Sequence, residues 1–427
     1  MATGSSRTAR SRVVAFACAV ATVTAGALFA APAQAAPSTP DGADAALVAA
    51  AQERVAHLRA FRPQDTEPVD SVAVEALAAR AFGAEPAALA VAADESVDRV
   101  YGQNRWETAV AVSHLYGLGD GGRSGVLNGR IDADEQAAPV VYVASGMGYA
   151  DALSAAPAAA FNRGPLLLTP AAAIPEVVLW EIERLHPARI VVVGGTASVS
   201  DAAYAQLAAI QPNIRRDAGR DRYETSRVVV QRGFDYAARG MDASRIAYLA
   251  SGTGYADALA ASAAAATVGS PVVLVDGRAT TADAATTVLL RDRLGAEYLF
   301  LAGGAASISS AYERNLLAQP WVTVPTRLAG NDRFGTANAI NAYLFGLLHA
   351  DGVLTPGSVN YTSGLNFPDA LSAGAMAGYF FEPLYLSLPS CIPAQAVRDP
   401  RSWGVTSFYV IGGPGVLDAA VENLTTC

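Results

Sequence analysis

The sequence predicts an α/β protein built from three tandem modules with parallel sheets, preceded by a short helical segment. Two observations lead to this prediction. Four sequence signatures recur three times, in the same order, between residues 97 and 427. Within each copy, short apolar runs alternate with segments of helical spacing, which is typical of βαβ units whose sheet is covered on both faces. We therefore delimit repeats at 97–212, 213–323 and 324–427, each long enough to bury its own core.

The four signatures have fixed places within each repeat. The first is Arg-x-x-Gly-x-x-Arg-aromatic-x-Thr, which begins at Arg99, Arg216 and Arg327. The second is Ser-Gly-x-x-aromatic-x-Asp-Ala-Leu, which begins at Ser145, Ser251 and Ser363. A proline that opens an apolar strand follows each motif aspartate after 14 residues, at Pro165, Pro271 and Pro383. A Gly-Gly pair precedes the last helix, starting at Gly194, Gly303 and Gly412. The identical aspartate-to-proline spacing excludes a chance similarity of composition.

The elements of the first repeat can be assigned in order. A helix is expected over 107–116, because the Arg-aromatic-x-Thr segment opens an amphipathic pattern. About ten residues more than in the other copies follow, and we place them in a surface loop within 119–139. Strands and helices then alternate over 140–144, 151–161, 165–168, 175–185 and 190–193, with a last helix from about residue 200.

The first 96 residues differ from the repeats. Residues 1–35 are predicted to be a secretory signal peptide, with three arginines, an apolar run over 13–30 and small residues at a cleavage site. A transmembrane anchor is the alternative, since the run could nearly span a bilayer. Residues 36–96 are acidic and rich in alanine, with helical spacing over 43–60 and 71–82, so we expect a helical spacer or a small acidic helical cap. No membrane span is expected after cleavage.

Composition excludes several classes of protein. The chain has no lysine, and its net charge of −9 becomes about −12 once the leader and its three arginines are removed. A generic nucleic-acid-binding protein would carry a basic excess, so that class is excluded. A P-loop needs a lysine and is impossible here. Four histidines and three cysteines are too few for a zinc or iron–sulfur framework, so neither a metal nor a cofactor is expected.

The second arginine of the first signature is the clearest candidate for ligand binding. It recurs as Arg105, Arg222 and Arg333, each followed by an aromatic residue. A guanidinium group binds phosphate or carboxylate in a bidentate manner, and the adjacent ring could stack on a sugar. The alternative is a structural ion pair with a carboxylate such as the motif aspartate. Repetition alone does not distinguish the two.

The Ser-Gly loop joins a strand to a helix at the sheet edge where open α/β sheets bind ligands. Hydroxyls are the expected ligand contacts there, at Ser145, Ser251 and Ser363. The motif aspartates are expected to cap the following helix, at Asp151, Asp257 and Asp369. The amides of Gly194 and Gly303 could contact an anionic group, although close packing of strand and helix explains these glycines equally well. No histidine recurs with the serines, so no catalytic triad is predicted.

Two cysteines follow the leader, Cys391 and Cys427, both in the third repeat. An even count in an exported chain favours a disulfide, which would close a loop of about 37 residues and hold the last helix in place. The alternative is two free thiols.

These signatures resemble the cell-wall-binding repeat family of type 2, found on Gram-positive surface proteins. The resemblance rests on the two long signatures, the Pro-Leu-Leu-Leu strand at 165–168 and the Val-Val-Gly-Gly-Thr-Ala-Ser-Val end at 192–199. The third copy departs from the pattern, with Gly-Gly-Pro-Gly at 412–415. The resemblance implies Toprim-like, Rossmann-like modules arranged as a pseudo-trimer about a threefold axis, without nuclease activity.

The resemblance also implies a function. It implies a secreted protein of the cell wall or cell surface that binds an anionic, teichoic-acid-like glycopolymer non-covalently and is not an enzyme. The alternative is a secreted wall-modifying hydrolase with its site in the Ser-Gly loops. Three near-equivalent sites count against that alternative, because tandem catalytic copies are rarer than tandem binding copies. An internal pseudo-threefold arrangement is compatible with a monomer.

Overall fold

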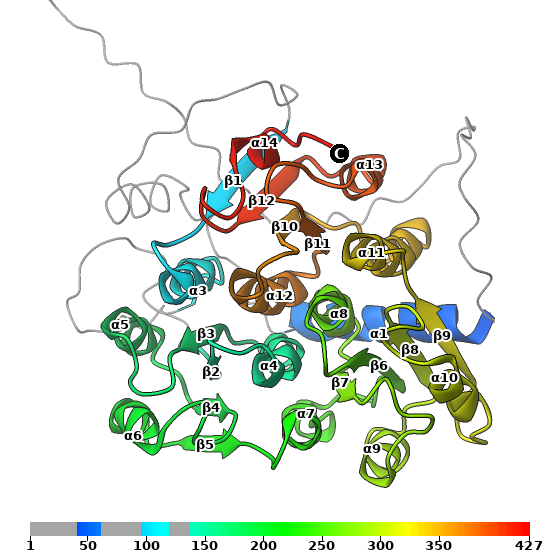
Figure 1. Ribbon diagram of the computed structural model, residues 1–427, viewed down its shortest axis with the longest axis horizontal. Helices are drawn as coiled ribbons and strands as arrows, with labels where there is room; N and C mark the ends of the chain where they lie inside the picture. Colours follow the sequence, from blue (N-terminus) through cyan, green and yellow to red (C-terminus); the bar gives the residue numbers. More distant parts are fainter. Residues whose placement is uncertain (1–40, 61–94, 119–136) are drawn as a thin grey trace, which may run out of the picture.

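The computed structural model describes residues 41–60, 95–118 and 137–427 (Figure 1). The expected signal peptide at 1–35, the helical stretch at 71–82 and most of the loop at 119–139 lie outside the described residues. Within the described residues the predicted fold class is confirmed: three modules with parallel sheets accompany one N-terminal helix.

Each module contains a parallel sheet of four strands. The first sheet has the order β3 (Leu166–Thr169), β2 (Val141–Ser145), β4 (Ile190–Val193) and β5 (Ile214–Asp217). The second has the order β7 (Val272–Val275), β6 (Ile246–Ser251), β8 (Tyr298–Ala302) and β9 (Val324–Leu328). The third has the order β11 (Leu384–Ser387), β10 (Val359–Ser363), β12 (Ser407–Ile411) and β1 (Ser96–Val100). Strands such as β2 and β4 are buried along their whole length, which explains their apolar sequences.

The fourth strand of the first and second sheets comes from the repeat that follows in sequence, and the fourth strand of the third sheet comes from the first repeat. β5 and β9 open the second and third repeats, yet they pair with the sheets of the first and second. β1 opens the first repeat and pairs with β12, so that it completes the third sheet. Our sequence analysis began each repeat with a helix and missed these strands, because they are polar. The repeats and the sheets are therefore offset by one strand.

Three central helices form the middle of the molecule (Figure 1). They are α4 (Ala150–Phe161), α8 (Ala256–Thr267) and α12 (Pro368–Phe380). They are rich in alanine, almost wholly buried, and packed against one another about a pseudo-threefold axis. The packing depends on small residues: a Cβ added to Gly378 would lie only 2.4 Å from the Cβ of Ala266.

The first helix of each repeat links two modules. These helices are α3 (Arg105–His114), α7 (Arg222–Gly233) and α11 (Arg333–Ala350). Each packs against the outer strand of its own sheet and against the central helix of the preceding module; α7, for example, contacts both β7 and α4. Each begins after a side-chain cap that accepts from the backbone N–H groups of the first turn, at Asn104, Asp221 and Asp332.

The remaining helices lie outside this centre. They are α5 (Glu176–Leu185), α6 (Asp201–Ile210), α10 (Ser310–Leu317), α13 (Ala394–Ser402) and α14 (Ala419–Glu422), with a 3-10 turn η1 (Ala237–Arg239). In the second module the counterpart of α5 is shorter, because α9 (Ala284–Val288) continues as a π-turn, η2 (Leu289–Arg293).

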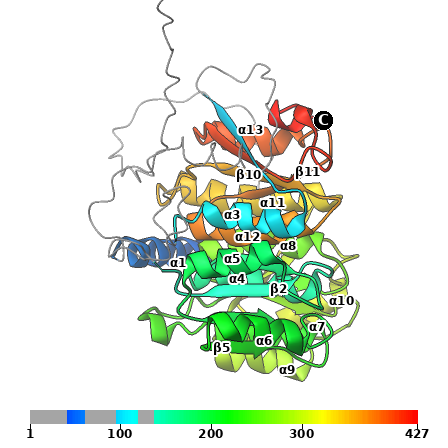
Figure 2. The same cartoon turned by 90° about the vertical axis from the view of Figure 1, so that its left-hand side faces the viewer.

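Helix α1 (Asp41–Ala60) lies across the end of the molecule where the central helices finish (Figure 2). Its Leu47 is fully buried in the core. Arg54, only 1% exposed, donates to the carbonyl oxygens of Ala160 at 2.9 Å and Phe161 at 3.4 Å. A cation is favourable at this helix C-terminus, although burial lowers the pKa of Arg54 to about 9. None of the described helices is both long and apolar enough to cross a membrane.

Candidate functional site

Three aromatic side chains meet where the central helices begin. Tyr149, Tyr255 and Phe367 come from the three Ser-Gly loops, and the ring centroids of each pair lie 5.7 Å apart. The tyrosine hydroxyls join neighbouring loops, since Tyr149 donates to the Thr253 carbonyl at 3.1 Å and Tyr255 to the Gly364 carbonyl at 3.3 Å. We call the three rings the aromatic triangle. The three loops thus form one continuous structure around the axis.

Arg105, Arg222 and Arg333 lie beside this triangle, and we call them the arginine ring. In each, Nη1 donates to a backbone carbonyl of the Ser-Gly loop of the same repeat, at 2.5 Å to Gly146, 2.6 Å to Gly252 and 2.7 Å to Gly364. The same atom of Arg333 donates to the hydroxyl of Tyr255 at 2.8 Å. The guanidinium carbon of Arg222 lies 5.7 Å from the ring centroid of Tyr149. The arginine ring is therefore attached to the Ser-Gly loops through the Nη1 atoms of its three members.

The other edge of each guanidinium group has no hydrogen-bond or ion-pair partner in the part of the chain that the structure describes. Among the described residues, no carboxylate lies within ion-pair distance of the arginine ring, and no acceptor is bound to its Nε or Nη2 atoms. Arg222 is exposed, and the other two are half-buried. The ion pair with the motif aspartate, which was the alternative interpretation, is thus not formed. Each arginine retains Nε and Nη2 as a pair of parallel donors.

The loop serines are buried beneath this surface. Their exposed fractions are 6% for Ser145, 6% for Ser251 and 2% for Ser363. Each hydroxyl accepts from a backbone N–H of its own loop, for example from Leu365 to Ser363 at 3.2 Å. The hydroxyls thus stabilise the turn.

The motif aspartates do not cap the central helices, so the predicted N-cap role is wrong. The N-cap positions are held by the triangle residues, without a side-chain bond. Asp151 and Asp257 lie two residues further on, within the first turn, and each accepts a 2.6 Å hydrogen bond from a serine that follows the Gly-Gly turn, Ser198 and Ser307. The aspartates therefore join the Ser-Gly loop to the Gly-Gly turn of the same module.

The third module lacks that serine, because Val416 stands at the equivalent position. Burial raises the pKa of Asp369 to about 6, opposed by the Thr108 hydroxyl and the positive charge of Arg105. Burial also raises the pKa of Asp257, where Ser307 offers a further opposing hydrogen bond. Thr108 and Arg105 belong to the first repeat, so Asp369 lies at the contact between the third and first repeats.

The Gly-Gly turns have a packing role. Gly194 and Gly303 have φ of +105° and +102°, and a Cβ there would lie 2.4 Å and 2.2 Å from the Oδ2 atoms of the motif aspartates. Their amides donate at 2.9 Å to Asp217 of β5 and Leu328 of β9. Because the sheet uses both N–H groups, our suggestion that they contact an anion is wrong.

The first arginine of each signature is a structural residue that we did not weigh. Arg99, Arg216 and Arg327 lie on β1, β5 and β9 and donate through Nη1 to the carbonyls of the Gly-Gly turns, at 2.7, 3.0 and 2.8 Å. Each also pairs with a carboxylate on the last helix of the module whose sheet its strand completes, at Glu422, Asp201 and Glu313. In the sequence, the threefold recurrence of these arginines was the one feature that could have indicated their role.

The structure joins Cys391 and Cys427 in a disulfide, with Cα atoms 5.4 Å apart. A parallel bridge between Ile392 and Thr426 lies beside it. Within the ranges 41–60, 95–118 and 137–427, His, Cys, Asp and Glu form no group of three that could hold a metal ion.

The fold and the loops define a repeat protein of three interlocked parallel α/β modules. The chain belongs to the cell wall binding domain 2 (CWB2) family, whose model matches it at residues 99–204, 216–313 and 327–422. The predicted resemblance is thereby confirmed, together with the three tandem copies.

Two curated relatives share part of this sequence. N-acetylmuramoyl-L-alanine amidase LytC of Bacillus subtilis (strain 168) is 28% identical over 332 residues, which are 78% of this chain and 58% of the amidase. An amidase enhancer of the same strain is 25% identical over 280 residues, 64% of this chain and 35% of the enhancer. The chain therefore spans less than two thirds of either relative.

Two solved structures share the fold. Cwp6 from Clostridium difficile has a TM-score of 0.64 at 22% identity, over 81% of this chain and 50% of that one. Cwp8 from the same organism has a TM-score of 0.62 at 22% identity, over 77% of this chain and 52% of that one.

Proposed function

We propose that the protein is secreted after removal of residues 1–35 and is retained on the cell wall non-covalently by the repeats at 97–212, 213–323 and 324–427. The arginine ring binds an anionic, teichoic-acid-like glycopolymer. Membership of a cell-wall-binding family supports retention on the wall. The assignment of an anionic polymer as the ligand rests on one observation: the Nε and Nη2 donors of the arginine ring have no partner among the described residues.

The loop carbonyls fix the orientation of each guanidinium group through Nη1. Nε and Nη2, which have no partner among the described residues, then remain as two parallel donors, a spacing that matches two oxygens of a phosphate or carboxylate. Because the side chains are held in place beforehand, less conformational entropy is lost when a ligand binds.

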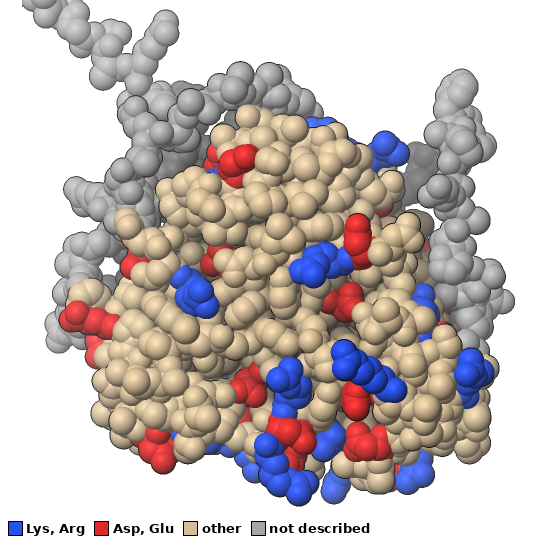
Figure 3. All heavy atoms as spheres, viewed as in Figure 1, with Lys and Arg blue, Asp and Glu red and all other residues tan. Residues whose placement is uncertain are grey.

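The surface around the arginine ring is suited to a polymer that carries apolar carbons between its charged groups. Met147 and Leu365 follow the Ser-Gly turns and are 65% and 54% exposed. Figure 3 views the end opposite α1, where charged side chains are scattered over a largely uncharged face. The chain carries a net charge of −9, so local arginine contacts, and not the overall field, must attract a polyanion.

We propose binding without catalysis. Ser145, Ser251 and Ser363, which the hydrolase alternative would use, are buried and hydrogen-bonded within their loops. This arrangement supports a binding role over nucleophilic attack.

Sedimentation with purified cell walls tests the proposal. The protein should pellet with native walls and remain in solution with walls from which phosphodiester-linked polymers have been stripped by acid. No soluble fragments should be released from either wall. Equal retention on stripped walls would remove the anionic polymer as the ligand, and released fragments would favour the hydrolase.

A further inference from the structure

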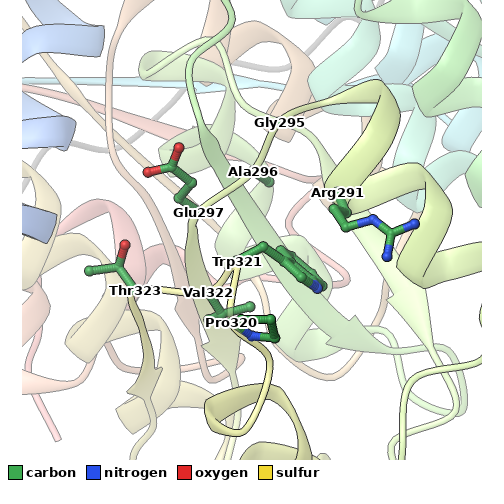
Figure 4. Close-up of a pocket in the computed structure, with 8 residues that line it drawn as sticks. All are labelled: Arg291, Gly295, Ala296, Glu297, Pro320, Trp321, Val322 and Thr323. Atoms are coloured by element: carbon green, nitrogen blue, oxygen red, sulfur yellow. The ribbon is translucent and has the colours of Figure 1, made fainter.

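A second surface site lies in the middle module, at the N-terminal ends of its strands (Figure 4). A cavity of about 310 Å³ opens there beside β8 and β9, with Arg291, Gly295 and Trp321 among its lining residues. That volume lies at the lower end of the range found for small-molecule pockets. The arginine ring follows the C-terminal ends of the strands, so the two sites are at opposite ends of the sheet.

Two departures from the first module build this cavity. In the first module α5 is a regular α-helix throughout. In the second module the corresponding helix, α9, continues as the π-turn η2, which carries Arg291. The connection between the last helix and the fourth strand has six residues, 318–323, whereas the first module has three, 211–213. The longer connection carries Trp321. Both departures line the same cavity, and π-turns within helices occur often at functional sites.

The cavity offers an aromatic surface and unused hydrogen-bond donors. Trp321 is partly exposed, while its Nε1 is buried without an acceptor among the described residues. Arg291 is 49% exposed and donates to Asp292 through Nε at 2.6 Å and Nη2 at 2.9 Å. Three of its five N–H groups remain for a ligand. A Cβ on Gly295 would meet nothing within 4 Å, so the mouth of the cavity is open.

We propose that this middle-module pocket binds one pyranose unit of a glycan and gives the protein a second contact with the wall, an inference that rests on the proposed wall-binding function. The C–H groups of a pyranose face are apolar and slightly positive, and they pack well on the negative face of an indole ring. Sugar hydroxyls accept from Arg291.

Nuclear magnetic resonance of protein labelled with ¹⁵N-tryptophan tests the pocket. The four tryptophans give four indole cross-peaks, and Trp321→Phe identifies the one that belongs to the pocket. The probe is N,N′-diacetylchitobiose, which carries no charge and therefore does not compete for the arginine ring as an anion. It should shift the Trp321 peak saturably in the millimolar range. The peak of Trp180, 56% exposed on α5 of the first module, is the matched control and should stay in place.

Arg291→Gln completes the test, because an exposed side chain can be changed without loss of folding. It should weaken the binding of chitobiose roughly tenfold, as expected for the loss of a charged donor. An unmoved Trp321 peak at about 50 mM probe, an equal shift of Trp180, or unchanged affinity in Arg291→Gln would each overturn the inference. The outcome is independent of retention on stripped walls, since the probe contains no phosphate.

Discussion

Arg99 of β1 forms an ion pair with Glu422 of α14, so the start of the first repeat is bound to the end of the third. The same guanidinium donates to the carbonyls of Gly412 at 2.7 Å and Leu417 at 2.9 Å. The strand that carries it supplies the outer edge of the third sheet. One side chain thus closes the arrangement of three modules.

We therefore predict that Arg99→Ala destabilises the protein by about 2–4 kcal/mol, because several partly buried acceptors lose their donor together. Arg220→Ala is the control: its side chain is 89% exposed and pairs with Glu224 in the first turn of α7. That change should leave the free energy of unfolding nearly unaltered. Urea unfolding followed by circular dichroism measures both. Equal stability of the two variants would contradict the closing role of Arg99.

The stability of the third module should fall as pH rises through the neutral range. Burial raises the pKa of Glu382 to about 7, opposed by hydrogen bonds from Ser358 and Asn360. In the unfolded chain a glutamate titrates near pH 4. Because the folded state binds the proton more tightly, the contribution is full below about pH 4 and is lost as pH rises through about 7.

Glu382→Gln isolates this effect, since it keeps the shape of the side chain and cannot ionise. The wild type should lose on the order of 1–3 kcal/mol relative to this variant between pH 5 and pH 8. Denaturant melts of both proteins at the two pH values provide the measurement. Parallel pH dependence in the two proteins would show that Glu382 does not titrate with a raised pKa.

The disulfide between Cys391 and Cys427 should stabilise the third module. The two cysteines are 36 residues apart, and closing such a loop contributes roughly 3–4 kcal/mol in the chain-entropy model. Reductant should lower the melting temperature of the wild type and leave that of the double serine variant unchanged. Alkylation of the unreduced, denatured protein followed by mass measurement provides a direct check. Two alkylated thiols would mean that the bridge is absent.

The alternation of strands and helices could be predicted because buried parallel strands are apolar throughout. β4 at Ile190–Val193 was predicted with both of its ends. β5 could not be predicted in this way, because it reads Ile-Arg-Arg-Asp. Its charges are satisfied only in the folded protein, where Asp217 pairs with Arg232 of α7 at 3.0 Å and Arg216 donates to the Gly194 carbonyl at 3.0 Å. No pattern within the strand indicates those partners.

The candidate site was predicted by recurrence, and its individual roles were predicted less well. The repeated signatures identified the residues that meet around the axis. The partner of Asp151 is Ser198, 47 residues away, and only the folded chain brings them together. The helix cap could have been found, because Asn104 directly precedes Arg105 and an Asx residue at that place is repeated in all three copies.

Wall affinity of Arg222→Ala, compared with Arg220→Ala, tests the central claim most directly. Arg222 is the first residue of α7 and Arg220 lies two residues before it; both changes remove one positive charge, and only Arg222 belongs to the arginine ring. We predict that Arg222→Ala weakens binding to native walls roughly tenfold with little change in melting temperature, while Arg220→Ala binds like the wild type. Equal binding by the two variants, or unfolding of Arg222→Ala without a binding defect, would contradict the arginine ring as the polymer-binding site.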